Sequence, residues 1–288
     1  MGDAGLEWNE KKCKCAHLKR GKIFIEDITL EDGFKLKCLT SFDLYKYLGV
    51  PECIVHDIPT LCEKLLKIIT GRANIMWSSP LSGSNKVTAT NTFVNSTAEY
   101  FFWSEKFRVD DLKKMDICVR EAMVKNGAKH CQQMNSLLYL PKSMGGRGLK
   151  SLENTYKETK IKAAIKLLNT TDKRIMLVTM FNRNCLKSNH ASIFKDAVKY
   201  ATDLDLKLKI EENSYSVSFE KKHEMISTDS ITVIKGQITQ KRNKKLECEI
   251  FKSTWQGLNF KFRKEDETLE PGCYDWLKKV AECTIVYN

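Results

Sequence analysis

The sequence predicts an α+β protein in which a small β region precedes a mainly helical region and a mixed C-terminal part. Near the N-terminus, apolar residues recur at every second position, which is the period of a strand. From about residue 57 they recur at every third or fourth position, which is the period of a helix facing a core. Beyond residue 170, short alternating segments return among helical ones.

The composition favours a globular protein with a polyanionic partner. The chain has 288 residues, 42% of them apolar, and a formal net charge of +12. This charge favours partners such as nucleic acid. We expect no membrane partner, because no apolar run is long enough to span a bilayer. The 11 cysteines are scattered and form no Cys-x-x-Cys pair, so we expect an intracellular, reducing compartment.

The N-terminal segments predict strands. Residues 22–28 and 34–38 alternate, and Glu31-Asp32-Gly33 between them is a turn signal, so we expect a hairpin. A further short strand is expected around Tyr45 and Tyr47, ending in a turn at Gly49 and Pro51.

Four helices are expected next. The first begins near residue 57, and Gly71 offers a break. The third follows Asp110-Asp111, which we interpret as a helix cap. The fourth follows a glycine-rich loop at 141–149. The apolar positions that define the four are Ile58, Leu61, Leu65, Ile69; Val87, Val94, Ala98, Phe101; Leu112, Met115, Val119, Met123; and Ile161, Ile165, Leu168.

The C-terminal part is less regular. Residues 190–201 predict a helix, and residues 204–210, 215–219 and 258–262 alternate like strands without an assigned partner. Residues 169–172 are a candidate boundary, and the basic run at 235–245 suits an exposed loop as well as a binding segment.

Two basic segments are candidates for phosphate binding. Residues 11–22 carry six cations and no acid, which suits either phosphate contacts or a solvated face. Residues 142–166 carry seven cations around Gly145-Gly146-Arg147-Gly148. Glycines let the backbone approach an anion, but this run lacks the Walker spacing, and a tight turn before a helix explains it as well.

The residues alone give no complete active site. Cys13, Cys15 and His17 share one face of a strand, but three ligands without a fourth rarely form a zinc site, so buried thiols are the preferred interpretation. Asp203 and Asp205 would share a strand face without a third carboxylate. We therefore expect no metal site here.

The order of several motifs resembles one family. The quoted runs are Asn9-Glu10-Lys11-Lys12-Cys13-Lys14, then residues 45–51, Asn85-Lys86-Val87, Asn91-Thr92-Phe93, Leu138-Tyr139-Leu140-Pro141, residues 145–149 and Ser151-Leu152-Glu153. Over residues 5–168 the chain resembles the palm end and thumb of non-LTR, target-primed retrotransposon reverse transcriptases. Residues 254–279 resemble the segment after the thumb more loosely.

The resemblance implies a division and a set of roles. Residues 1–52 would be the end of the palm, 53–168 the helical thumb, and 169–288 a post-thumb extension. Lys12 would protonate the pyrophosphate leaving group, and the primer grip would comprise Tyr45, Lys46, Tyr47, Leu48 and Gly49. The side chains expected to contact nucleic acid are Lys14, Lys19, Arg20, Lys86, Arg147, Lys150, Lys157 and Lys160.

The family's metal-binding Tyr-x-Asp-Asp turn would lie upstream of Lys12. We therefore expect a fragment of an RNA-directed DNA polymerase that does not polymerise alone, with Mg²⁺ required only by an intact parent. Its partners would be the RNA template, the DNA primer and the upstream palm and fingers, in the nucleus. The alternatives are a stand-alone basic nucleic-acid-binding module and a non-functional retroelement relic.

Overall fold

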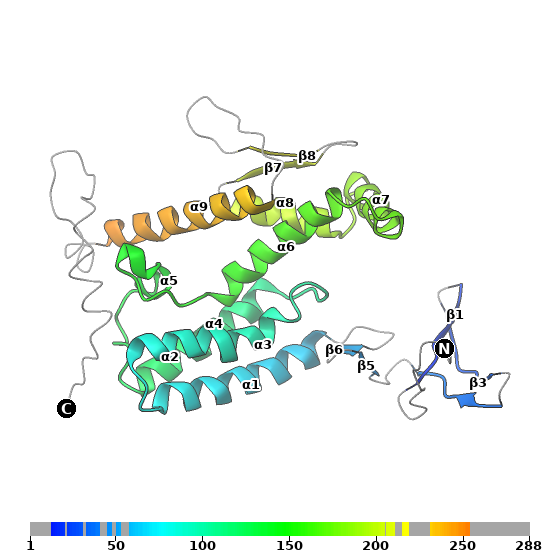
Figure 1. The fold of residues 1–288 in the computed structure, drawn as a ribbon, viewed down its shortest axis with the longest axis horizontal. Helices are drawn as coiled ribbons and strands as arrows, with labels where there is room; N and C mark the ends of the chain where they lie inside the picture. The colour runs from blue at the N-terminus through cyan, green and yellow to red at the C-terminus, as the bar shows by residue number, and fades with distance from the viewer. Residues whose placement is uncertain are drawn as a thin grey trace. The chain divides into compact units, whose positions relative to one another are not determined.

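The computed structural model describes residues 13–20, 22–30, 33–40, 45–47, 50–52, 58–204, 206–210, 215–218 and 231–253. The chain forms two compact units, Met1–Leu61 and Cys62–Asn288. The long helix α1, Ile58–Ser78, runs across the division between them (Figure 1).

The first unit is built from antiparallel strand pairs. β1 (His17–Lys19) pairs with β2 (Lys22–Phe24), and β3 (Ile28–Thr29) pairs with β4 (Lys35–Leu36). The predicted hairpin is thus confirmed at β3 and β4, where Gly33 adopts a left-handed φ of 81° before β4. Residues 22–24 pair with β1 instead, and β1 begins at His17, the last residue of the strand face expected at Cys13, Cys15 and His17.

A third strand pair carries the first part of the predicted primer grip. β5 (Tyr45–Tyr47) pairs with β6 (Val50–Glu52), and Lys46 lies opposite Pro51. The strand at Tyr45 and Tyr47 is confirmed. The connection after Tyr47, where the turn is expected, lies outside the described residues, and Pro51 belongs to β6, since a two-stranded sheet tolerates a proline whose missing N–H is not needed for pairing.

The second unit begins with α1 and a second helical segment, α2 to α3, and hydrogen bonds from Arg72 join the two. α2 (Gly83–Ala89), the π-helical turn η3 (Thr90–Asn95) and α3 (Ser96–Glu99) follow one another directly. Arg72 Nη1 on α1 donates to Phe93 O at 2.9 Å and to Thr97 Oγ1 at 2.7 Å. The break expected at Gly71 was wrong. That residue lies on the exposed side of α1, where a missing side chain leaves no gap in the core.

α4 (Val109–Lys125) has the predicted stripe, and Leu112, Met115, Val119 and Met123 are all buried. The prediction that Asp110-Asp111 caps this helix was wrong, because the helix begins before these residues. Arg108 is the N-cap residue, and both acids lie in the first turn, where the helix dipole favours negative charge. α5 (Ser136–Tyr139) and the 3₁₀ turn η4 (Lys142–Met144) lead into α6 (Leu152–Leu168).

The elements after residue 170 agree with the prediction only in part. α8 (Ile193–Asp203) matches the helix expected at 190–201, and β7 (Lys207–Ile210) pairs with β8 (Tyr215–Ser218). α7 (Lys173–Lys187) was not predicted. α9 (Ile231–Lys252) replaces the loop expected at 235–245, because its few buried apolar residues are spaced widely among cations. The strand expected at 258–262 and Asp205 lie outside the described residues.

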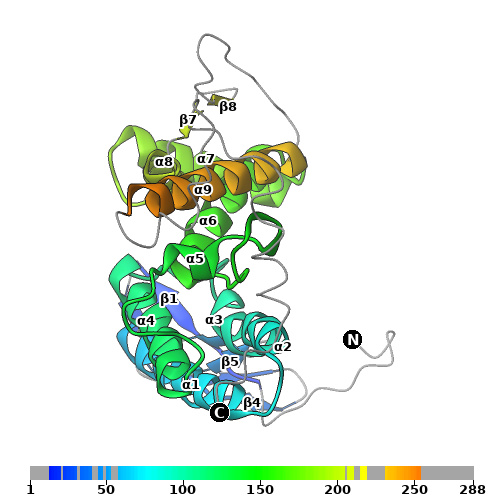
Figure 2. The same cartoon turned by 90° about the vertical axis from the view of Figure 1, so that its left-hand side faces the viewer.

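α6 is the central element of the second unit. It packs against α4, α8 and α9, and both views of the fold show it between α4 and α9 (Figures 1 and 2). Its Tyr156 is fully buried and makes edge-to-face contacts with Phe102, Phe107 and Tyr200. The Tyr156 hydroxyl accepts a hydrogen bond from Phe107 N at 3.1 Å, so the buried phenol is also satisfied.

The observed class is α+β, mainly helical with small antiparallel sheets, as the sequence predicts. Within the described residues, no helix is long and apolar enough to cross a membrane.

Substitution by alanine should change the stability of the protein in opposite directions at two glycines. A Cβ on Gly146 would lie 2.0 Å from the backbone oxygen of Leu140, so Gly146→Ala should lower the free energy of unfolding by about 3 kcal/mol. Gly71→Ala meets nothing within 4 Å and should raise it by about 0.5–1 kcal/mol. Urea denaturation checks both. Equal effects of the two variants would contradict the close approach at Gly146.

Candidate nucleic-acid interface

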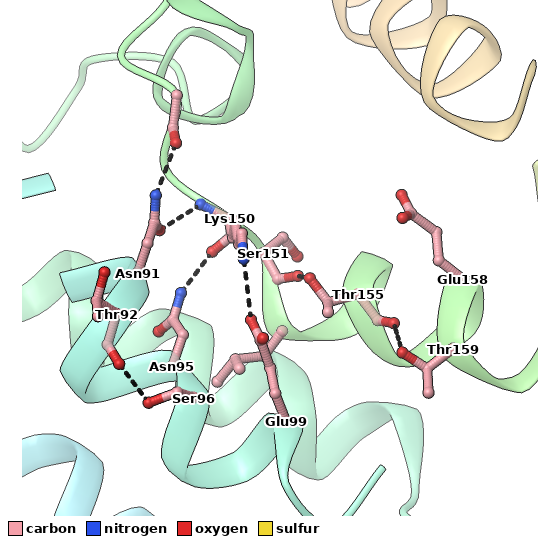
Figure 3. Close-up of polar contacts among 12 residues, drawn as sticks. Asn91, Thr92, Asn95, Ser96, Glu99, Lys150, Ser151, Thr155, Glu158 and Thr159 are labelled. Carbon is pink, nitrogen blue, oxygen red and sulfur yellow. Dashed lines mark hydrogen bonds and ion pairs between the residues drawn. The ribbon is translucent and has the colours of Figure 1, made fainter. Parts of the chain in front are cut away.

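Two of the quoted motif runs meet in space. The side chain of Asn91 donates from Nδ2 to Gly148 O at 2.9 Å and accepts from Lys150 N at 2.9 Å (Figure 3). One turn further, Asn95 Nδ2 donates to Lys150 O at 2.9 Å. η3 and the segment that leads into α6 are therefore held together by three hydrogen bonds between residues more than 50 positions apart.

The glycine-rich loop is closed by its own backbone. The N–H groups of residues 145–149 donate to the carbonyl oxygens of Lys142, Pro141, Leu137, Leu140 and Leu138, in that order. Gly145 and Gly148 adopt left-handed φ angles of 79° and 73°, which glycine tolerates without strain. Because these N–H groups already have acceptors, they are not directed at an anion. The geometry favours the tight turn over the phosphate loop.

The structure turns most predicted cations of this segment inward. Arg147 Nη1 donates to Ala128 O, and burial lowers the pKa of Arg147. Lys157 is buried and lies 2.9 Å from Glu153 Oε1 and 3.0 Å from Asp203 Oδ2. Burial alone would lower the pKa of Lys157, but the hydrogen bonds to these two carboxylates raise it. Lys150 remains exposed, with its Nζ 3.9 Å from Glu99 Oε1.

Lys160 is the most buried of the predicted binding residues. Its side chain is 4% exposed, and its Nζ lies 5.3 Å from the centre of the Tyr156 ring. Burial lowers its pKa from 10.5 to about 8, against the opposing charges of Asp196 and Glu105. The position of Lys160 thus serves the packing of α6, and its ammonium group does not reach the surface.

The remaining predicted residues divide between the two units. In the first unit, Lys14, Lys19 and Arg20 are exposed, and Arg20 has a φ of 51° after β1. β5 holds Tyr45, Lys46 and Tyr47. Lys12, Leu48 and Gly49 lie outside the described residues. In the second unit, Lys86 Nζ donates to Trp77 O at 3.0 Å and joins α2 to the end of α1.

The outward face of α1 is a cationic surface that the sequence reasoning missed. Lys64, Lys67, Ile68, Gly71, Arg72 and Ile75 follow one another at helical spacing and are exposed, opposite the buried Leu65, Ile69, Ala73 and Trp77. Residues 62–78 contain one acid, Glu63. The apolar stripe of this helix was recognised, and its charged side could have been found by the same periodicity. We call Lys64, Lys67, Gly71 and Arg72 the α1 face.

Exposed aromatic side chains lie next to this face. The bonds from Arg72 to Phe93 O and Thr97 Oγ1 place η3 and α3 beside α1. Phe93 in η3 and Tyr100 directly after α3 are 57% and 54% exposed. Cations with neighbouring exposed rings suit the phosphates and the sugar or base faces of nucleic acid.

A polar cleft of about 380 Å³ in the second unit holds a different arrangement. Its lining includes Arg120, Glu153, Lys157, Arg242 and Glu249. Arg120 Nη1 donates to Tyr139 Oη at 2.6 Å, Arg242 Nη1 lies 2.7 Å from Glu158 Oε1, and Glu249 Oε2 accepts from Ser136 Oγ at 2.5 Å. Each of these charged groups already has a hydrogen-bonding partner on another helix, so the cleft is a polar contact region between helices.

No metal centre is formed by the side chains that the structure describes, since no three His, Cys, Asp or Glu residues gather there in a suitable arrangement. Cys15 forms a β-bridge with Cys38, and Cys38 N donates to Asp27 Oδ1 at 2.9 Å. Cys13 and Cys15 are half-buried, so the burial expected for these two thiols is only partial, and the neighbouring Cys38 is the buried one.

A comparison of the sequence with protein-family models and with curated proteins found no match.

The buried ammonium of Lys160 predicts a pH dependence. The unfolded chain holds this proton up to a pKa near 10.5, whereas the folded chain releases it near pH 8. The unfolded state therefore binds more protons in this window, and the contribution of Lys160 to the free energy of unfolding rises with pH. Relative to Lys160→Met, the wild type should gain on the order of 2 kcal/mol between pH 8 and pH 10.

Urea denaturation of both proteins across this range measures the difference. The subtraction removes the titration of tyrosines and cysteines that both proteins share. A difference that stays flat or falls with pH would show that Lys160 remains charged in the folded chain.

Proposed function

We propose that the chain is the palm end and thumb of a non-LTR retrotransposon reverse transcriptase, and that it binds the template–primer duplex. The α1 face carries this proposal. It presents three cations on one side of the first long helix after the strand pairs, in the segment that the resemblance assigns to the thumb.

The α1 face has the dimensions of a phosphate-binding surface. Lys64 and Arg72 lie eight residues apart, which is about 12 Å along a helix. A duplex strand presents a phosphate about every 3.4 Å of its axis, so these cations span several phosphates. Gly71 adds no side chain between them, which lets a sugar–phosphate backbone approach the helix closely.

Arg72 is positioned for the same role. Its Nη1 is held by Phe93 O and Thr97 Oγ1, which orients the planar guanidinium. A guanidinium has five N–H donors, so two hydrogen bonds leave donors for a phosphate oxygen. Such contacts are blind to sequence, and the expected binding is salt-dependent and guided by duplex shape.

The contacts between the motif runs add support for the family. Asn91 and the loop at 145–149 belong to separate runs of the resemblance, and the hydrogen bonds of Asn91 and Asn95 join them in one structural unit. The pairing of β5 with β6 is also what a primer-grip hairpin requires. Lys12 would act on the leaving group only in the complete parent polymerase, together with Mg²⁺ held by its aspartates.

Binding to a short RNA–DNA hybrid tests the proposal. Lys64→Glu with Lys67→Glu should raise Kd at least about ten-fold and reduce the slope of log K against log salt by about 2, since each lost phosphate contact removes about 0.9. Fluorescence anisotropy over a salt series measures both quantities. The matched control is Lys113→Glu with Lys114→Glu, whose lysines are exposed but lie 3.7 and 3.1 Å from Asp110 and Asp111.

The outcomes separate the alternatives. Equal losses in the two double variants would overturn the assignment to the α1 face. Equal affinity for the hybrid and for double-stranded DNA would favour a stand-alone basic module over a thumb. A folded chain that binds neither duplex would favour the relic. Primer extension on an RNA template with Mg²⁺ by this chain alone would contradict the expectation that it is an inactive fragment.

A further inference from the structure

α7 exposes its apolar side chains. Leu177, Met180 and Phe181 are 68%, 59% and 67% exposed, and Met176 and Val178 beside them are exposed as well. Helices on the surface of a globular protein place such residues against the core. Several large exposed apolar side chains on one helix are typical of an interaction site.

The inward side of α7 is polar. Thr179 and Asn182 are buried, and each bonds the end of a neighbouring helix. Thr179 Oγ1 donates to Leu167 O in the last turn of α6 at 2.9 Å. Asn182 Oδ1 accepts from Ile193 N, the first residue of α8, at 3.0 Å. Turning the apolar side inward would break both bonds, so the fold itself fixes the outward direction of Leu177 and Phe181.

The outward residues follow the spacing of a helix–helix seam. Steps of four and three residues, which keep positions on one face of a helix, connect residues 173, 177, 180, 184 and 187. Leu177 and Met180 occupy the centre of this seam, with Phe181 beside them, and Lys173 and Lys187 occupy its ends. The seam is about 20 Å long, enough for an amphipathic helix to pack along it.

The charge of α7 has one sign. Residues 173–187 contain four cations and no acid. Lys173 and Arg174 lie in the first turn, where the helix dipole disfavours positive charge. These two cations therefore do not stabilise their own helix, and they are suited to carboxylates brought by a partner.

We propose that α7 binds an acidic amphipathic helix of another protein. Its apolar side would cover Leu177, Met180 and Phe181, and its carboxylates would pair with Lys173 and Arg174 in the first turn of α7. A second copy of this chain would bring a helix of the same positive charge. A membrane surface would favour a continuous row of cations along each side of the apolar strip, whereas α7 has a single arginine on each side, Arg174 beside Val178 and Arg183 on the side of Met176.

A synthetic peptide provides a defined probe. It is a fluorescein-labelled helix of about three heptads, with leucine at the two seam positions and glutamate at the flanking positions. The matched control peptide has lysine in place of every glutamate. By anisotropy, the full chain should bind the glutamate peptide at least about ten-fold more tightly than the lysine peptide.

Variants of α7 locate the binding. Leu177→Ser with Phe181→Ser should weaken glutamate-peptide binding at least about ten-fold, while circular dichroism and the urea midpoint stay unchanged because both side chains are exposed. The control, Ile68→Ser with Ile75→Ser on α1, should bind like the wild type. Lys173→Glu with Arg174→Glu should reduce the preference for the glutamate peptide.

Three results would overturn the proposal. The first is equal binding of the two peptides, or binding that survives Leu177→Ser with Phe181→Ser. The second is no peptide binding together with α7-dependent binding to phosphatidylcholine–phosphatidylserine vesicles, which would identify a membrane surface. The third is no peptide binding together with an α7-dependent dimer in sedimentation, which would identify a second copy.

Discussion

The pairing of buried charges on α6 is the constraint on which the second unit depends. Lys157, Glu158 and Lys160 are all buried in the middle of this helix. A buried charge without a partner costs several kcal/mol, so each has to be compensated where it lies. Lys157 is paired with Asp203 at the end of α8, and Glu158 with Arg242 on α9. These pairs link α6 to the end of α8 and to α9.

This constraint also divides the positive charge of the chain into two kinds. Cations near α6, such as Lys157 and Arg242, are held by carboxylates and serve the fold. Cations on the outside of α1, such as Lys64 and Lys67, are exposed on a helix side with little acid. A net charge of +12 therefore overstates what any one ligand would meet, and the α1 face presents three of the exposed cations.

The sequence was informative wherever one side of an element faces a core. The stripe of α4 from Leu112 to Met123 was predicted and is buried, because an apolar spacing of three and four has one physical solution beside a core. The same rule missed α7, whose apolar side faces outward and whose Thr179 faces inward. Reasoning from local sequence also assigned the wrong role to Lys157, which was expected to contact nucleic acid. Lys157 lies in a basic run, but its partner Asp203 is 46 positions away, and the composition of a short segment cannot predict so distant a contact.

The π-helical turn at η3 has a mechanical consequence for the second unit. It places Asn91 and Asn95 where both side chains form hydrogen bonds with the backbone just before α6. At the start of α6, Asp116 on α4 accepts hydrogen bonds from Leu152 N at 2.8 Å and from Ser151 Oγ at 2.7 Å. The start of α6 is thus clamped from two helices at once. Because these bonds reach the start of α6 from both η3 and α4, moving the first turn of α6 away from either segment would require breaking them.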